Sequence, residues 1–229
     1  MEKNRGKLIL IEGTDCSGKE TQANLLVEAL KKAGIKIQKV SFPDYESPTG
    51  KIVGGPYLGK SYICEGYFEE GANHVSPKVS ALYYGADFLY HLEEMNKILE
   101  KGTWILLDRY FYSTFAHQGG KERNKQKRLE MYKWLEKLEF DLLGLPDPEI
   151  KVFLHMPYEC SVKLRKERAE AADQNERSSV HLKNAEQAFL EVAELYHFHT
   201  ISCDRRKKIK TIEEIHEEIL EYVKKEIEK

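Results

Sequence analysis

The sequence lacks long apolar segments and any strong excess of charge. No stretch approaches the roughly 20 apolar residues that span a membrane, and no apolar segment precedes the first expected strand. We therefore expect a cytoplasmic protein with no membrane partner. The formal net charge is only -2, and charges of both signs are interspersed. This balance gives no electrostatic reason to expect DNA or RNA as a partner.

Cysteine is also scarce, and the chain has no internal repeat, low-complexity tract or interdomain linker. The four cysteines lie far apart and form no C-x-x-C pair, which argues against both a zinc site and a disulfide framework. We expect most of them to be buried or incidental thiols. The length of 229 residues fits one α/β domain, residues 1–229.

A phosphate-binding motif lies near the start of the chain. Leu8 to Ile11 is a β-branched apolar run, typical of a strand buried on both faces. It leads into Gly13-Thr14-Asp15-Cys16-Ser17-Gly18-Lys19, which has the G-x-x-x-x-G-K spacing of a phosphate-binding loop. The glycines let backbone N–H groups turn onto an anion, the following helix adds its positive end, and the lysine reaches the outer phosphates.

The position after the loop lysine departs from the strict motif. A magnesium-binding Ser or Thr is usual there, but this chain has Glu20, and a hydroxyl follows one residue late at Thr21. Metal ligation through the loop is therefore left open. The alternative for the whole motif is a glycine-rich turn without a ligand, and the strand and helix patterns on either side argue against it.

Alternating strand and helix patterns continue along the chain. Four further apolar runs are expected to be strands: Lys36 to Phe42, Trp104 to Asp108, Ile150 to Met156 and Thr200 to Cys203. Helical spacing separates them, notably over Pro77 to Leu99, and a Thr211–Glu214 capping box opens a closing helix. We therefore predict an α/β fold with a five-stranded parallel sheet, helices on both faces and ligands at the carboxyl ends of the strands.

Two other stretches carry charge. Asp108 ends a buried strand, where magnesium is usually held, and Arg109 beside it suits phosphate oxygens, although Asp-Arg pairs at strand ends are often only structural. Arg165 and Arg168 are three residues apart, so both could face a phosphoryl group, or simply form a charged helix face. The polar segment Lys121 to Arg128 is expected to be a solvated helix start or loop.

Three motifs in the right order resemble the thymidylate kinases. They are E-G-x-D-x-x-G-K-x-T-Q at Glu12 to Gln22, F-P-D-Y at Phe42 to Tyr45, and D-R-Y-x-x-S-x-x-A-x-Q at Asp108 to Gln118. The resemblance implies a P-loop kinase fold with a short helical lid at about residues 162–180. It also implies transfer of the γ-phosphoryl group of ATP to dTMP, with Mg²⁺, by a homodimer.

For the donor side, the resemblance implies that the loop binds the ATP phosphates through Gly13, Thr14, Asp15, Cys16, Ser17, Gly18, Lys19, Glu20 and Thr21. Asp15 would contact the 3'-hydroxyl end of the acceptor, Asp108 would organise magnesium, and Arg109 would hold both phosphates together. Cys16 stands where one branch of the family has an arginine, so Arg165 and Arg168 in the lid are expected to supply that charge. The adenine contact is expected near Cys203 to Lys207.

For the acceptor nucleotide, the implied binding residues are Phe42, Tyr45, Tyr84, Phe88, Arg109, Thr114, His117, Gln118, Asp173 and Glu176. Tyr84 suits stacking on a base. Phe88, however, replaces a family arginine that binds the base, and His117 replaces an aromatic residue near C2' of the sugar. Specificity for thymine is thus open, and Tyr84 and Phe88 could instead be plain helix core.

Two alternatives to a dTMP kinase follow. The first keeps the reaction and changes the acceptor to another or modified pyrimidine nucleoside monophosphate. The second is a nucleotide-binding regulatory module without catalysis. A GTPase switch is disfavoured because Asn124-Lys125-Gln126-Lys127 ends in Lys where the guanine-reading motif has Asp.

Overall fold

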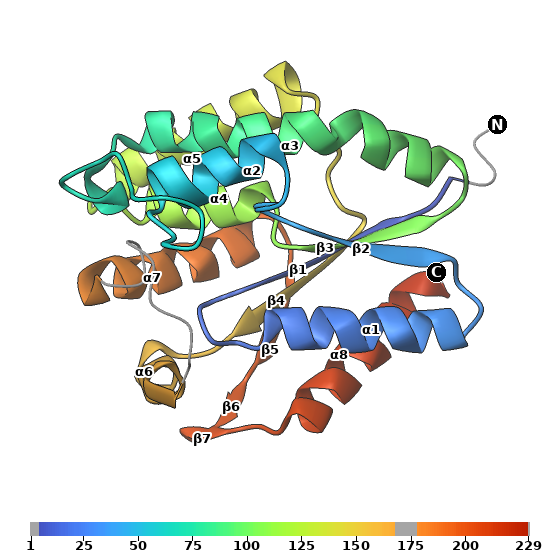
Figure 1. Ribbon diagram of the computed structural model, residues 1–229. Coiled ribbons are helices and arrows are strands. Elements are labelled where there is room, and N and C mark those ends of the chain that lie inside the picture. Colours follow the sequence, from blue (N-terminus) through green and yellow to red (C-terminus); the bar gives the residue numbers. More distant parts are fainter. Residues whose placement is uncertain (1–4, 168–177, 229) are drawn as a thin grey trace.

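The computed structural model describes residues 5–167 and 178–228, and a five-stranded parallel sheet forms its centre (Figure 1). The strand order is β2-β3-β1-β4-β5. The strands are β1 (Leu8–Gly13), β2 (Ile37–Ser41), β3 (Trp104–Asp108), β4 (Ile150–His155) and β5 (His199–Ser202). Every residue of β1 is buried, because this strand lies between β3 and β4 and both faces of the sheet are covered.

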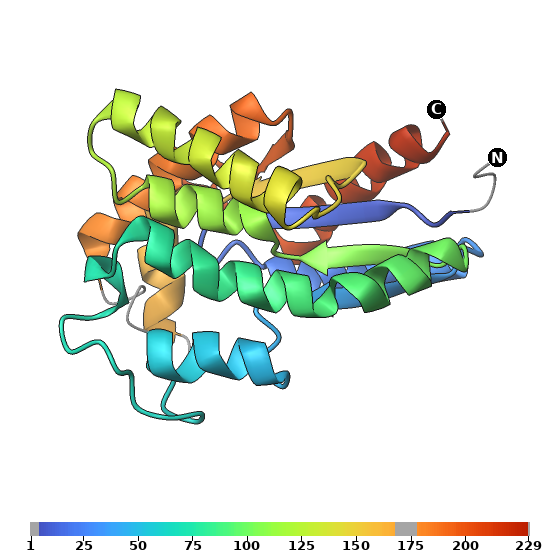
Figure 2. The ribbon, with the colours of Figure 1, turned by 90° about the horizontal axis from the view of Figure 1, so that it is seen from above.

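Helices cover both faces of this sheet, as predicted (Figures 1 and 2). The longer helices are α1 (Lys19–Lys32), α3 (Pro77–Glu100), α4 (Phe111–Gly119), α5 (Lys125–Glu136), α6 (Tyr158–Glu167), α7 (Ser179–Leu195) and α8 (Ile212–Ile227). Side chains of α3, α4 and α5 form the core on one face, and those of α1 and α8 form the core on the other. Helix α7 packs against α4 and β4 through Phe189 and Phe153.

Several local predictions are confirmed. Helix α1 ends where Gly34, with φ of 85°, donates its backbone N–H to the carbonyl of Lys31. Helix α8 begins with the expected capping box, in which Thr211 and Glu214 bond each other's backbone N–H groups. The long helix predicted over Pro77 to Leu99 is α3.

The sequence did not predict the short elements between the major ones. They are α2 (Pro48–Ile52), two π-helical turns (Val53–Tyr57 and Lys137–Leu142), a 3₁₀ turn (Ala72–His74) and an antiparallel hairpin made of β6 (Asp204–Arg205) and β7 (Lys208–Ile209). The hairpin follows β5 directly, in the segment expected to contact adenine.

The prediction of a solvated helix start or loop over Lys121 to Arg128 is confirmed for residues 123–127, which are exposed, but not for the two ends of the segment. Helix α5 does begin there, at Lys125, but Arg128 is buried and its Nε and Nη2 each donate a 2.6 Å hydrogen bond to the carboxylate of Glu191 on α7. Lys121 Nζ donates to the carbonyls of Ala72 and Val75. Long basic side chains can be buried where distant acceptors satisfy their charged ends, and the local sequence does not reveal those acceptors.

The predicted lid over 162–180 includes the end of α6 and the start of α7. Most of the intervening segment lies outside the described residues. Within the described residues, no helix is both long and apolar enough to cross a membrane.

Candidate active site

The phosphate loop connects β1 to α1 and is anchored to the end of β4. Thr14 Oγ1 donates to the carbonyl of Met156 and accepts from its backbone N–H, both at 2.8 Å. Gly13 must lack a side chain, because a Cβ there would lie 2.6 Å from Ser17 Oγ and 2.7 Å from the carbonyl of Leu154. The loop therefore has one fixed path over the carboxyl ends of β1 and β4.

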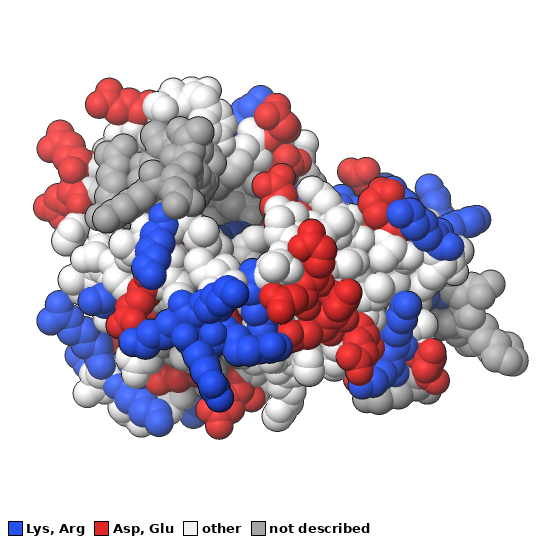
Figure 3. Space-filling view, turned by 90° about the horizontal axis from the view of Figure 1, so that it is seen from below, with Lys and Arg blue, Asp and Glu red and all other residues white. Residues whose placement is uncertain are grey.

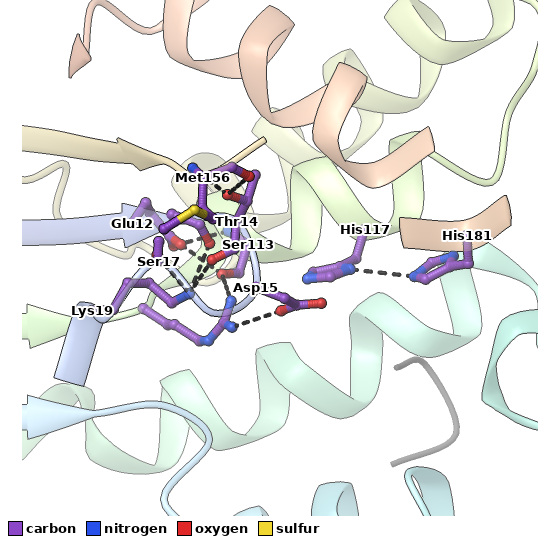
Figure 4. A network of polar contacts seen from close by, with 11 residues as sticks. Glu12, Thr14, Asp15, Ser17, Lys19, Ser113, His117, Met156 and His181 are labelled. Carbon is purple, nitrogen blue, oxygen red and sulfur yellow. Dashed lines mark hydrogen bonds and ion pairs between the residues drawn. The ribbon is translucent and has the colours of Figure 1, made fainter. Parts of the chain in front are cut away.

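Lys19 lies in the first turn of α1 and is almost fully buried. Its Nζ donates 2.9 Å hydrogen bonds to the carbonyls of Gly13 and Thr14, so the ammonium is held inside the curve of the loop (Figure 4). Burial lowers the pKa of this ammonium to about 8. The charged form still dominates at neutral pH, as phosphate binding requires.

Glu12, the acidic residue within β1, joins the loop to the D-R-Y motif. Its carboxylate accepts hydrogen bonds from the backbone N–H groups of Tyr110 and Ser113 and from Ser113 Oγ, at 2.9, 3.0 and 2.7 Å. Burial raises the pKa of Glu12, which these donors and nearby cations oppose. Glu12 thus fixes the start of α4 against β1, about 100 residues away in the chain.

Arg109 leaves β3 with a positive φ of 68°, a conformation that non-glycine residues adopt at a cost. Its guanidinium reaches the loop, where Nη2 lies 3.4 Å from Asp15 Oδ1 and Nη1 donates to Ser113 Oγ. Burial opposes the charge, but the carboxylates of Asp15, Glu12 and Asp108 outweigh it and raise the pKa of Arg109. The guanidinium is therefore a permanently charged group directly above the loop.

The side chains of Asp15, Lys19 and Arg109 border one cavity of about 730 Å³ at the carboxyl end of the sheet. The predicted site residues that line it are Asp15, Cys16, Ser17, Gly18, Lys19, Glu20, Thr21, Phe42, Tyr45, Tyr84, Phe88, Asp108, Arg109, Thr114 and His117. The cavity is large enough for ligands the size of nucleotides. Residues from the phosphate loop, α1, β2, α3, β3 and α4 thus meet at the carboxyl end of the sheet, where the sequence predicted that ligands bind.

Some predicted site residues are not brought into this cavity. Gln118 is buried but is not among the lining residues, and Gly13 and Thr14 form the base of the loop behind it. Arg165 lies in the last turn of α6. Arg168, Asp173 and Glu176 fall outside the described residues.

The wall formed by α3 is aromatic and uncharged. Phe88 is buried against the rings of Phe42 and Tyr110, with centroids 5.1 and 5.3 Å away. Tyr84 is half-buried and packs edge to face with Tyr57. Both residues therefore belong to the helix core and to the cavity lining at the same time, so the two interpretations of their role do not exclude each other.

His117, on the α4 wall, is paired with a second histidine. Its Nδ1 lies 3.3 Å from Nε2 of His181 on α7, and the two rings stack 5.5 Å apart at an angle of 16° (Figure 4). Burial lowers the pKa of both imidazoles, to about 3 for His117 and about 4 for His181. Two neutral, stacked rings thus lie together at neutral pH, and His117 presents this pair to the cavity.

The metal-binding capacity of the site is limited. Among the described residues, no group of three or more His, Cys, Asp or Glu side chains is arranged to hold a metal ion. Asp108 ends β3 at the cavity wall, and Asp15, Glu20 and Thr21 are further oxygen donors lining the same cavity. This set suits Mg²⁺, which takes one or two protein carboxylates and completes its shell with phosphate and water oxygens.

Sequence reasoning did not assign roles to Glu12 and Asp87. The carboxylate of Asp87, fully buried on α3, accepts hydrogen bonds from Asp44 N, Ser47 Oγ and Thr49 Oγ1. It therefore fixes the segment after β2 that carries Phe42 and Tyr45. In the sequence, each of these residues is an acidic residue within an otherwise apolar strand or helix face. Because a buried carboxylate requires partners, that pattern indicates a carboxylate with a structural role.

The β6–β7 hairpin borders the loop from the other side. Cys203, which precedes it, is buried with its Sγ 3.8 Å from the carbonyl of Ser17. The hairpin carries the four exposed basic residues from Arg205 to Lys208. On the face seen in Figure 3, Lys and Arg side chains gather beside a patch of Asp and Glu side chains.

Comparison with known proteins gives consistent matches. The thymidylate kinase family model matches residues 11–219. A thymidylate kinase of Plasmodium falciparum is 35% identical over 119 residues, about half of each chain, and a probable thymidylate kinase of Pyrococcus abyssi is 27% identical over 97% of this chain and 98% of its own. The solved thymidylate kinase of Candida albicans superposes with a TM-score of 0.72 at 25% identity, covering 96% of this chain and 92% of the other.

Proposed function

The chain belongs to the thymidylate kinase family, and we infer from this membership that it is an ATP-dependent nucleoside monophosphate kinase that transfers the γ-phosphoryl group of ATP to dTMP, giving ADP and dTDP. The observation that carries this inference is the convergence of Lys19, Asp108 and Arg109 on one cavity. All three groups bear charge suited to phosphates or to their counterion.

The loop half of the cavity is proposed to bind the donor. Backbone N–H groups of the loop and the start of α1 would hold the ATP phosphates, and Lys19 would contact the outer ones. The adenine would lie near Cys203 to Lys207, a placement supported by the contact between Cys203 and the loop. The adjoining basic hairpin would attract the anionic nucleotide.

The opposite half is proposed to bind the acceptor. Tyr84 would stack on the base, and Phe42, Phe88 and Thr114 would shape its pocket. Asp15 would orient the 3'-hydroxyl end. Arg109 would then lie between the two phosphoryl groups and stabilise the charge that develops during in-line transfer.

Magnesium is proposed to be held by Asp108 together with the ATP phosphates. When bound, Mg²⁺ neutralises charge on the transferred group and its neighbours. Arg165 and Arg168 are proposed to add positive charge from the lid, with Asp173 and Glu176 facing the acceptor. These lid assignments and the ligand role of Gln118 remain predictions.

An acceptor other than dTMP is the alternative that a specific observation favours. Phe88 is buried in an aromatic cluster, so α3 offers no charged hydrogen-bond donor at the position where the family has an arginine. A pocket without that donor would discriminate less between bases. Related pyrimidine nucleotides, including modified ones, are therefore candidate acceptors as well.

A coupled assay of ADP release across dTMP, dUMP, dCMP, dGMP and AMP tests both versions. The largest kcat/KM with dTMP is expected, and a larger value with another pyrimidine nucleotide would favour the alternative acceptor. Absence of turnover with all five would contradict the kinase assignment. Nucleotide binding detected by calorimetry without turnover would favour a regulatory module instead.

A homodimer is proposed as the assembly, and a cytoplasmic location as the compartment. The solvent-facing side of α3 carries an apolar stripe made of Val79, Leu82, Ala86, Leu89 and Tyr90. Exposed apolar stripes of this kind support an interface with a second chain. Light scattering should give the mass of a dimer, and Leu82→Glu should yield monomers while Glu94→Lys, elsewhere on the exposed surface of α3, should not.

A further inference from the structure

Lys60 lines the main cavity, and no sequence motif singled it out. Its backbone is fixed in the turn after the π-helical segment Val53–Tyr57. The N–H of Lys60 donates to the carbonyl of Gly54 at 2.8 Å, and its own carbonyl accepts from Ile63 N and Cys64 N. The turn therefore presents this side chain to the cavity from a well-anchored backbone.

Gly54 makes this arrangement possible. A Cβ at this position would lie 2.4 Å from Ile63 Cδ1 and 2.7 Å from Tyr45 Cδ1. The ring of Tyr45 and the turn that carries Lys60 consequently pack directly on the backbone of the same helical segment. Tyr45 and Lys60 are thus held side by side.

Two aromatic rings position the ammonium of Lys60. Its Nζ lies 5.0 Å from the centroid of Tyr45 and 5.7 Å from that of Tyr62. The face of an aromatic ring attracts a cation, so the two rings hold the ammonium beside the cavity. Tyr62 is largely exposed, which puts this cluster at the rim of the cavity.

The charges around the cavity indicate which anion this ammonium would meet. Among the described lining residues the Lys and Arg side chains are Lys19, Lys60 and Arg109. Lys19 is held within the phosphate loop, whereas Lys60 and Arg109 come from other segments of the cavity wall. Tyr45, which holds the Lys60 ammonium, lines the same cavity as Arg109.

We propose that Lys60 binds the phosphate monoester of the acceptor nucleotide, together with Arg109. This inference rests on the proposed function, which assigns that half of the cavity to the acceptor. The aromatic side chains of Tyr84 and Phe88 leave the base end of the pocket without charge, so Lys60 and Arg109 would draw the phosphate toward the loop. Lys60 would then contribute to acceptor binding more than to the transfer step.

Calorimetric binding of dTMP and of thymidine, its analogue without phosphate, tests the proposal in the full-length protein. Lys60→Met keeps the length and apolar stem of the side chain but removes its charge. The dissociation constant for dTMP should rise by roughly tenfold, while that for thymidine should stay within about twofold. In the coupled assay, KM for dTMP should rise with little change in kcat or in KM for ATP.

Two further variants make the result specific. Lys60→Arg should recover most of the dTMP affinity, and Lys51→Met, at an exposed position on α2, should leave it unchanged. The role of Lys60 would be overturned if Lys60→Met weakened the binding of dTMP and of thymidine equally, or weakened neither. This conclusion requires that the wild-type protein turns over dTMP. A wild-type protein that neither binds nor phosphorylates dTMP would overturn the proposed function and this inference together.

Discussion

The guanidinium of Arg109 lies 3.4 Å from the carboxylate of Asp15, joining the end of β3 to the turn of the phosphate loop. Both side chains are mostly buried and belong to the lining of one cavity. Asp15 therefore holds the arginine over the loop, and the arginine compensates an acidic residue that would otherwise repel phosphates. Glu12 reinforces this arrangement by fixing Ser113, the second partner of Arg109.

Removal of this arginine should abolish catalysis without unfolding the protein. In Arg109→Ala we expect kcat to fall by on the order of a thousandfold, because a fixed charge that stabilises the transferred phosphoryl group is lost. The melting temperature should change by only a few degrees. Steady-state kinetics and thermal unfolding measure the two effects, with Arg123→Ala at an exposed position as the matched control. Near-normal activity of Arg109→Ala would remove the role assigned to it.

The affinity for ATP should fall at alkaline pH, because Lys19 loses its charge there. Burial lowers the pKa of this ammonium to about 8, so it loses its proton as pH rises through that value. Affinity for ATP should be nearly constant from pH 6.5 to 7.5 and fall by roughly tenfold or more by pH 9.5. Titration calorimetry across this range measures the effect. Because burial also lowers the pKa of Lys121 to about 8, Lys19→Met is needed to identify the group. This variant should bind ATP weakly at every pH, and an unchanged alkaline fall would point to another residue.

The fold was predictable from sequence where the information is local. Leu8 to Ile11 reads as a buried strand because each residue is apolar, and the G-x-x-x-x-G-K spacing carries its own geometry. Arg128 and Lys60 show where this reasoning fails. Arg128 can be buried because the carboxylate of Glu191, 63 residues away in the chain, accepts its hydrogen bonds. Lys60 reaches the cavity because Gly54 lets the turn that carries it pack on a helix backbone. Such partners are set by tertiary packing, which the local residue pattern does not encode.

The paired imidazoles of His117 and His181 should make the fold sensitive to acid. Their pKa values in the folded protein lie well below 6.5, so the unfolded chain takes up protons first as pH falls below that value. Their contribution to stability is complete above about pH 6.5 and is lost progressively toward pH 4. Asp15, Arg109, Lys19 and Lys121 are the charged groups that act on the pair.

His181→Phe keeps a ring beside His117 and removes one of these titrating groups. Between pH 6.5 and 4.5 the variant should lose less unfolding free energy than the wild type, by about 2 kcal/mol. Urea unfolding at several pH values measures this difference. His74→Phe, at an exposed position, is the control and should follow the wild-type curve. Parallel curves for His181→Phe and the wild type would show that His181 does not titrate in this way.

Glu139 should have the opposite effect on stability. It is fully buried in the π-helical turn Lys137–Leu142, and neither carboxyl oxygen has a hydrogen-bond partner within the described protein. Burial raises its pKa from 4.5 to about 8. The folded protein therefore retains a proton that the unfolded chain releases above pH 4.5, and the resulting stability is present at low pH and lost as pH rises through 8.

Glu139→Gln should raise the melting temperature by roughly 5–10 °C near pH 8 and by almost nothing at pH 4.5. Scanning calorimetry at both pH values, with Glu130→Gln on the exposed side of α5 as control, measures this difference. A gain of equal size at both pH values would mean that the substitution acts through packing and that the carboxyl group of Glu139 does not titrate in this range.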